Sequence, residues 1–246
     1  MPLPRDRILP DTSTPPMPGS RIAVNLGKTG SGKTWTSRAR WWTWPRGVAI
    51  DTKLGGGEGE YPGWPAHSLQ ELEALLKKHA GGEHWRISYR GPTHFTQAGR
   101  KLDPVADAEP LFRVLARLES YLLVVEEAAD YCTDRKCPPS LRDMAFKGRT
   151  RGQALTINSQ RPASVAKDLI AEAQLVVAWP LQDPGDREAL RDRNFPLEVL
   201  DGLEGHESLR LLAPEGERPR FYVCRCSTPH SEVCGDPLPL PERRDP

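Results

Sequence analysis

The fold is decided by eight consecutive residues, Gly27, Lys28, Thr29, Gly30, Ser31, Gly32, Lys33 and Thr34. They match the pattern G-x-x-x-x-G-K-[ST] at every position, with an apolar run at residues 21–26 before them and a predicted helix from about Lys33 after them. Glycines at these positions let the backbone turn so that successive N–H groups point into one cavity, where they can bind phosphate oxygens. The N-terminus of the helix adds partial positive charge at the same place. The sequence therefore predicts a phosphate-binding loop.

Two residues of this loop have separate expected roles. Lys33 would reach the β- and γ-phosphates of a nucleotide, and the hydroxyl of Thr34 would ligate Mg²⁺. Trp35 follows directly and is counted with the eight loop residues as a candidate nucleotide contact. Trp35, Trp41, Trp42 and Trp44 could stack on adenine, fill a subunit interface or pack in the core, and we favour the core.

Apolar runs and helical stretches alternate along the rest of the chain. The predicted strands are residues 21–26, 47–50, 85–89, 121–125, 154–158 and 175–179, and the predicted helices include 68–80, 107–119 and 138–147. The run 121–125 is apolar throughout, as expected for a strand buried on both faces. This alternation predicts an α/β fold with a mainly parallel central sheet flanked by helices. Two extended runs within residues 206–226, around a Gly- and Pro-containing turn, predict a C-terminal β-hairpin.

Length and composition narrow the class of protein. A chain of 246 residues suits one large domain or two small ones. Residues 1–20 and 235–246 are Pro-rich and are expected to be arms on either side of one domain at 21–234. No apolar run approaches the roughly 20 residues of a membrane helix, and residues 1–20 lack an apolar signal region. We therefore expect neither a secreted nor an integral membrane protein. The net charge of +1 leaves any nucleic-acid binding to local basic loops.

Acidic and polar residues follow two of the predicted strands. Glu126 and Glu127 come directly after 121–125, where the first could hold the hydration shell of Mg²⁺ and the second could polarise an attacking water. Two adjacent acids favour hydrolysis over transfer to a small acceptor. Gln160, and less strongly Asn158, could sense the γ-phosphate from the end of the next strand.

Two arginines precede that same strand. Arg149 and Arg151 are candidates for an arginine that reaches the γ-phosphate of a neighbouring subunit and stabilises the charge of the transition state. Each could equally be an ordinary surface charge.

The five cysteines are odd in number, which favours reduced thiols. Their positions, Cys132, Cys137, Cys224, Cys226 and Cys234, match no strong zinc pattern. Ordinary thiols, a zinc site and a disulfide stay open at this point.

The segment 146–162, FKGRTRGQALTINSQRP, resembles the part of the FtsK/HerA superfamily in which a Gly-Arg pair leads into a strand ending in Gln-Arg-Pro. The segment 177–192 is similar to the next strand and helix start of that family, and residues 51–53 are similar to its Asp-x-Lys. The resemblance covers roughly residues 20–195. It implies a RecA-like P-loop NTPase core of the ASCE type. One departure matters, since the family usually has Asp-Glu where this chain has Glu126 and Glu127.

The resemblance also implies a function. It implies an ATP- and Mg²⁺-dependent ring motor, usually a hexamer, with nucleotide between subunits and double-stranded DNA in the pore. Carried over by position, Lys33 and Thr34 bind phosphate and Mg²⁺, Glu127 is the catalytic carboxylate and Gln160 the sensor, with Arg149 the best match for the arginine in trans.

The short chain is most similar to genome-packaging ATPases of tailless, membrane-containing viruses and phages. This likeness implies packaging into a preformed capsid, arms that could contact the capsid vertex protein, and a place in the host cytoplasm or the virion. A protein-moving assembly or secretion ATPase with a related core, and a non-motor nucleotide switch or kinase, are the alternatives.

Two loops are candidates for sequence-independent contacts with DNA phosphates. Arg135 and Lys136 lie in a loop that the resemblance places at the pore, and Arg100 and Lys101 lie in the segment 91–101. Both loops could also be ordinary solvated surface.

Overall fold

A computed structural model of the chain describes residues 21–51, 59–96, 98–132, 136–192, 194–213 and 219–224, together with the backbone of 237–238. The two Pro-rich arms predicted at 1–20 and 235–246 lie almost wholly outside these ranges, as do Arg135, Cys226 and Cys234.

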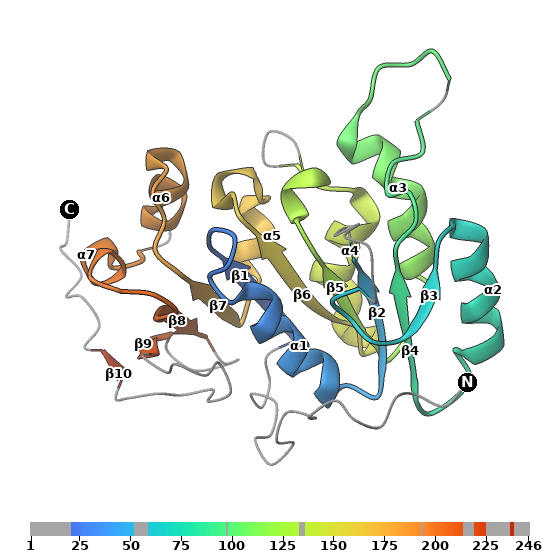
Figure 1. The fold of residues 1–246 in the computed structure, drawn as a ribbon, viewed down its shortest axis with the longest axis horizontal. Helices are drawn as coiled ribbons and strands as arrows, with labels where there is room; N and C mark the ends of the chain where they lie inside the picture. Colours follow the sequence, from blue (N-terminus) through green and yellow to red (C-terminus); the bar gives the residue numbers. More distant parts are fainter. Residues whose placement is uncertain are drawn as a thin grey trace.

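The centre of the molecule is a ten-stranded sheet in the order β10-β9-β8-β7-β1-β6-β5-β2-β4-β3 (Figure 1). Its strands are β1 (Ile22–Leu26), β2 (Arg46–Ile50), β3 (Trp64–Ala66), β4 (Trp85–Tyr89), β5 (Leu122–Val125), β6 (Ala154–Ser159), β7 (Leu175–Ala178), β8 (Ser208–Leu212), β9 (Arg220–Cys224) and β10 (Pro237–Leu238). Every pair from β7 to β3 is parallel, while β8, β9 and β10 add on antiparallel. The prediction of a mainly parallel sheet with a C-terminal hairpin is confirmed.

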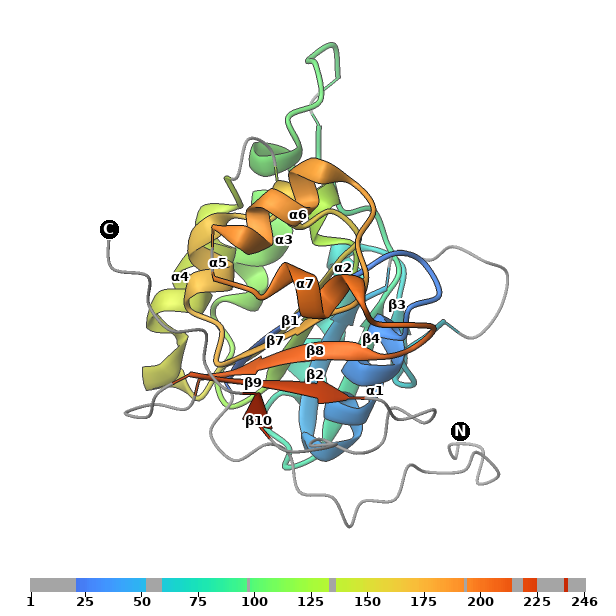
Figure 2. The ribbon, with the colours of Figure 1, turned by 90° about the vertical axis from the view of Figure 1, so that its left-hand side faces the viewer.

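Helices cover both faces of the sheet. They are α1 (Lys33–Thr43), α2 (Leu69–His79), α3 (Pro104–Leu115), α4 (Pro139–Lys147), α5 (Lys167–Ala171), α6 (Pro184–Arg191) and α7 (Leu197–Asp201), with short 3₁₀ turns η1 (Ala128–Asp130), η2 (Gly148–Arg151) and η3 (Pro162–Ser164). Figure 2 shows α1 on one side of the sheet and α3, α4 and α5 on the other. No helix in the described ranges has the length and apolar character needed to cross a membrane.

Alternate strand residues face opposite sides of the sheet and, within the described ranges, belong to three separate hydrophobic clusters. In the largest of these clusters, on one side of the sheet, alternate residues of β1, β2, β5 and β6 pack against the buried leucines of α2, α3, α4 and α5. On the other side, Leu122, Val124 and Ala154 pack with Trp41 of α1 and with Tyr61. Because both faces are buried, these central strands can be apolar throughout, which is how the sequence reveals them.

Some helix boundaries differ from those expected from the sequence. The helix expected at 107–119 is α3, which begins earlier because the carboxylate of Asp103 accepts hydrogen bonds from the N–H groups of Val105 and Ala106 and because Pro104 suits the first helical position. The helix α2 begins as expected, with the Ser68 hydroxyl accepting from the N–H of Glu71.

Candidate nucleotide-binding site

The predicted phosphate loop connects the end of β1 to the start of α1, as the blue loop left of the centre in Figure 1. Gly30 (φ 78°) and Gly32 (φ 115°) have left-handed backbone conformations that favour glycine. Gly27 is needed for space, since a Cβ there would lie 2.8 Å from Ser31 Oγ and 2.9 Å from Trp179 Cβ. The three glycines of the motif thus each have a physical reason in this loop.

The side chain of Lys33 folds back over this loop. Its Nζ donates to the carbonyl oxygens of Gly27, at 2.6 Å, and Lys28, at 2.9 Å, and the residue is only 6% exposed. An ammonium held against the carbonyls on the inner side of a loop is at the place where the loop would take up phosphate. Thr34 directly follows Lys33, so both residues lie in the first turn of α1.

The tryptophans near the loop divide between core and surface. Trp41 is fully buried, and Trp42 and Trp44 pack against its cluster, as expected. For Trp35 the core prediction is wrong, because this side chain is 41% exposed, with the guanidinium carbon of Arg38 5.8 Å from its ring centroid. Six residues of α-helix turn the side chain by about 120°, so Trp35 and Trp41 point in different directions.

The second acid after β5 is linked to the phosphate loop by two hydrogen bonds. Gln160 Nε2 donates to Glu127 Oε1 at 2.7 Å, and Thr29 Oγ1 donates to Gln160 Oε1 at 2.8 Å. The backbone of Glu127 has φ 47°, a left-handed conformation that is uncommon outside glycine, asparagine and aspartate. Three segments that are far apart in the sequence therefore meet at the carboxyl edge of the sheet.

The first acid after β5 lies deeper. Glu126 is fully buried, and its Oε1 accepts from the Tyr61 hydroxyl and from Asn158 Nδ2, the latter at 2.8 Å. Burial and the neighbouring Glu126 carboxylate raise the pKa of Tyr61 well above its ordinary value. The side chain of Asn158, the weaker candidate for the γ-phosphate sensor, is therefore hydrogen-bonded to the buried Glu126. Sequence patterns did not identify Tyr61 as a site residue, because it is separated from Glu126 by 65 residues.

A carboxyl group beside the second acid is also perturbed. Burial and the negative charge of Glu127 raise the pKa of Asp130, and His94 opposes this shift. The ring of His94 stacks on Tyr131 at 5.8 Å between centroids, and its Nε2 lies 3.0 Å from the Asp130 carbonyl oxygen. The segment after β4 therefore packs against the turn that contains Glu127.

The C-terminal part of the chain also contacts the phosphate loop. His206, between α7 and β8, has its Nδ1 3.3 Å from the Ser31 carbonyl oxygen. Trp179 Nε1 donates to the His206 carbonyl oxygen at 3.2 Å. The turn before β8 thus supports the loop from the side of β7, a contact that the sequence did not suggest.

Arg149 and Arg151 lie near the amino ends of the parallel strands, opposite to the carboxyl ends where the phosphate loop lies. They belong to η2, which directly precedes β6, and the six residues of that strand span about 20 Å. Both are exposed, and Arg151 Nη1 donates to the Ala116 carbonyl oxygen at 2.8 Å. The structure does not bring them to the phosphate loop of their own chain.

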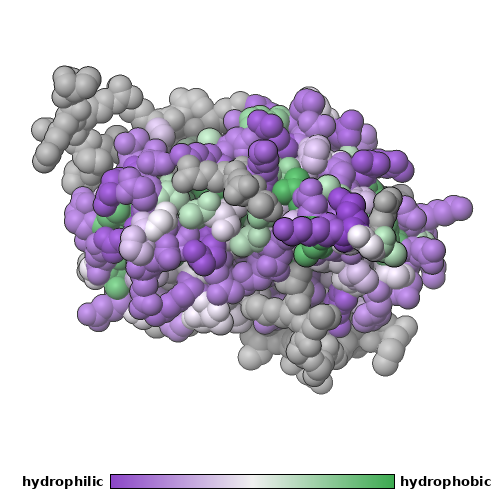
Figure 3. All heavy atoms as spheres, turned by 90° about the horizontal axis from the view of Figure 1, so that it is seen from above, coloured by the Kyte–Doolittle hydropathy of each residue, from purple (hydrophilic) through white to green (hydrophobic). Residues whose placement is uncertain are grey.

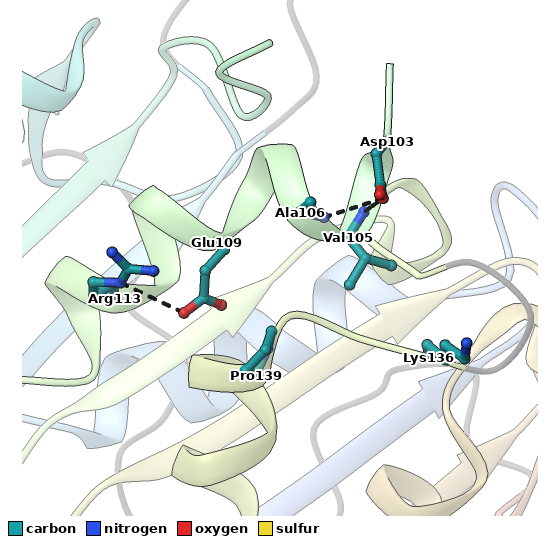
Figure 4. Close-up of a pocket in the computed structure, with 7 residues that line it drawn as sticks. All are labelled: Asp103, Val105, Ala106, Glu109, Arg113, Lys136 and Pro139. Carbon is teal, nitrogen blue, oxygen red and sulfur yellow. Dashed lines mark hydrogen bonds and ion pairs between the residues drawn. The ribbon is translucent and has the colours of Figure 1, made fainter. Parts of the chain in front are cut away.

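The described candidates for DNA contact lie in two segments of the chain and are exposed: Arg100, Lys101 and Lys136. Lys136 is exposed and lines a pocket of about 560 Å³ at the start of α3 and α4 (Figure 4). The guanidinium of Arg100 is paired with the buried Asp107, which also accepts from Thr96 Oγ1 at 2.9 Å, whereas Lys101 is exposed. Seen from above, the face that carries these loops is largely hydrophilic (Figure 3).

The described cysteines form no metal cluster. Cys132 and Cys137 are buried free thiols, Cys224 is buried, and no group of three potential metal ligands occurs within the described ranges. Burial raises the pKa of Cys132 to about 11 and that of Cys137 to about 12. Cys132 and Cys137 therefore have the character of inert buried thiols.

No protein-family model and no curated protein matches the sequence. Solved structures do match. The genome packaging NTPase B204 from Sulfolobus turreted icosahedral virus 2, in complex with AMPPCP, has a TM-score of 0.60 at 15% identity over 82% of this chain and 96% of that one. The chain has the fold of a packaging ATPase.

Two further structures agree with this assignment of the fold. B204, the DNA-packaging ATPase from Sulfolobus turreted icosahedral virus, has a TM-score of 0.57 at 14% identity over 82% of this chain and 96% of that one. VirB4 of Thermoanaerobacter pseudethanolicus has a TM-score of 0.54 at 14% identity over 80% of this chain and 87% of that one. The expected likeness to FtsK/HerA-type ATPases with a RecA-like core is thereby confirmed at the level of the fold.

Proposed function

We propose that this chain binds ATP with Mg²⁺ and hydrolyses the γ-phosphate. The observation that carries the proposal is a pair of hydrogen bonds, from Thr29 to Gln160 and from Gln160 to Glu127. They join the phosphate loop to the carboxylate after β5. A γ-phosphate in the loop would lie between Lys33 and these groups. Glu127 would accept a proton from the attacking water, Gln160 would report the γ-phosphate to Glu127, and Lys33 would stabilise the charge that develops.

The residues present suit Mg²⁺. This ion prefers oxygen ligands and keeps several of its waters. Thr34 is the last residue of the loop and the second residue of α1, and Glu126, the buried acid of the pair, directly follows β5. Thr34 would bind the ion directly and Glu126 would hold its water shell. When bound, Mg²⁺ supplies neutralising charge to the β- and γ-phosphates.

We propose further that hydrolysis drives the movement of double-stranded DNA, and that the chain is an FtsK/HerA-type motor that packages a viral genome into a preformed capsid. The likeness in fold to B204, whose structures are described as those of a genome-packaging enzyme, supports this. A ring of copies, hexameric in our proposal, would let Arg149 or Arg151 reach a neighbour's nucleotide and would multiply the basic charge of Lys101 and Lys136. Such a motor would work in the host cytoplasm or in the virion, with the capsid vertex as a further partner.

ATP hydrolysis measured with and without linear double-stranded DNA, at two salt concentrations, tests this function. The variants are Lys33→Ala and Glu127→Gln, with Lys77→Ala on the exposed face of α2 as the matched control. We expect hydrolysis that DNA stimulates, that loses this stimulation as salt rises, and that falls at least 100-fold in both site variants but not in Lys77→Ala.

Each other outcome contradicts a defined part of the proposal. Hydrolysis that DNA leaves unchanged would refute translocation and favour a protein-moving ATPase, the alternative that shares this core. Hydrolysis that survives Lys33→Ala would refute the site itself. Absence of hydrolysis at protein concentrations where a ring forms would refute the motor and favour a nucleotide switch.

A further inference from the structure

A connected group of buried polar side chains leads to Glu126, and apart from Glu126 its members have no part in the function proposed so far. Asn25 of β1 donates through Nδ2 to Ser37 Oγ of α1, at 3.0 Å, and to Asn158 Oδ1 of β6, at 2.8 Å. Ser37 Oγ lies 2.7 Å from the same Asn158 oxygen. Asn158 then donates to Glu126, which also accepts from the hydroxyl of Tyr61. The group ends on the acid expected to hold the Mg²⁺ hydration shell.

Tyr61 is held in place from two sides. Its ring meets the indole of Trp41 edge-on, with 5.7 Å between centroids and 76° between planes, and Trp41 Nε1 donates to the Pro62 carbonyl oxygen at 3.1 Å. One residue before it, the N–H of Glu60 donates to Asp51 Oδ2 at 2.7 Å, at the end of β2. The tyrosine is fully buried, so its hydroxyl has few ways to move relative to Glu126.

We propose that Tyr61 is a positioning residue for Mg²⁺, which fixes the direction of the Glu126 carboxylate by donating to its Oε1 together with Asn158. Two donors that converge on one oxygen stop the carboxylate from rotating about its last bond and so determine where its second oxygen points. A carboxylate that orders metal-bound water from the wrong direction loses much of its effect. This inference rests on the proposed use of Mg²⁺-ATP.

The aromatic contact adds a second consequence. Trp41 belongs to α1, the helix whose first turn contains Lys33 and Thr34. Tyr61 therefore contacts, through one ring and one hydroxyl, both the helix that supplies the direct Mg²⁺ ligand and the acid that holds the water shell. One residue outside the phosphate loop and the acid pair thus links the two elements that would hold the metal.

The test compares Tyr61→Phe with Tyr121→Phe. Tyr121 is also fully buried, and its hydroxyl donates to the Leu115 carbonyl oxygen at 2.8 Å, away from Glu126. Both variants keep the ring and lose one buried hydroxyl. The readouts are kcat, the Mg²⁺ concentration that gives half-maximal hydrolysis, and ATP binding measured in Mg²⁺ and in EDTA.

We expect Tyr61→Phe to lower kcat and to raise the required Mg²⁺ concentration, each about tenfold, which is what the loss of one hydrogen bond to a charged group amounts to. ATP binding in EDTA should stay unchanged in both variants, because no metal is then involved. Tyr121→Phe should keep the Mg²⁺ requirement of the unmodified protein, even where both variants melt at a lower temperature.

Equal Mg²⁺ requirements in the two variants would overturn the proposal. If the unmodified chain does not hydrolyse ATP, the proposed function fails, and the positioning role is decided by whether Tyr61→Phe weakens ATP binding in Mg²⁺ but not in EDTA. If Tyr61→Phe does not fold, Asn158→Ser removes the other donor to the same oxygen. It must then raise the Mg²⁺ requirement, and an unchanged requirement would again overturn the proposal.

Discussion

Replacing Asn158 by leucine removes every hydrogen bond of this amide while keeping the same branched arrangement of four side-chain heavy atoms. Its three shorter hydrogen bonds involve the carboxylate of Glu126, the amide of Asn25 and the hydroxyl of Ser37, and a longer one of 3.5 Å reaches the Tyr61 hydroxyl. All are fully buried, so water cannot replace the lost partner without opening the structure. Leaving a buried polar group short of a partner costs about 1 to 3 kcal/mol. Each of the three keeps at least one other bond, so the lower part of this range applies, and we expect a loss of about 4 kcal/mol in the free energy of unfolding.

The matched control is Thr156→Val in the same strand. Thr156 is also fully buried, and its hydroxyl has no hydrogen-bond partner within the described residues, so valine of the same shape should leave stability unchanged or raise it. Urea denaturation followed by circular dichroism measures both variants. For a chain of this size, the loss in Asn158→Leu corresponds to a melting temperature lower by about 8 to 16 °C. A loss below about 1 kcal/mol, or an equal loss in Thr156→Val, would refute the reasoning.

Three further predictions concern packing, protonation and capping. Gly47→Ala should cost about 1 to 3 kcal/mol in denaturant unfolding, because its Cβ would lie 2.5 Å from a ring carbon of Trp41. Burial raises the thiol pKa values of Cys132 and Cys137 above the ordinary 9.0, so their contribution is complete below pH 9 and is lost as pH rises toward 12. Between pH 9 and 10 the free energy of unfolding should fall by about 1 kcal/mol per thiol, and less in alanine variants. Ser68→Ala should cost about 1 kcal/mol through the lost cap of α2, measured by thermal melting.

The parts of the fold that the sequence predicted are those encoded by short local patterns. The phosphate loop could be predicted because backbone angles and contacts within a few residues require its glycines. The strands β5 and β7 could be predicted because burial on both faces leaves them apolar throughout, and β1 and the run 154–158 of β6 because they remain mostly apolar. In the same way, the place of Gln160 follows from its position directly after β6, at the edge where parallel strands end.

What could not be predicted depends on contacts between distant segments. Nothing near Tyr61 in the sequence indicates that its hydroxyl meets Glu126. Asn158 and Gln160 are two residues apart and share a strand parity, yet only Gln160 lies past the end of β6 and reaches Thr29. Arg100 is a candidate for DNA contact, and the sequence did not indicate that its exposed side chain pairs with the buried Asp107. For Tyr61 and Gln160, a partner far away in the sequence decides the role.

The direction of the strands also limits how the site can be completed. A parallel sheet places the phosphate loop, both acids and Gln160 at the carboxyl edge, and it places anything that directly precedes a strand at the other edge. Arg149 and Arg151 precede β6, about 20 Å away. An arginine side chain extends only a fraction of that distance. If either arginine stabilises the transition state, it must therefore act on the nucleotide of another copy, whose carboxyl edge faces η2. A role for these arginines in hydrolysis and an oligomeric enzyme are thus a single hypothesis for this fold, because the first has no geometry without the second.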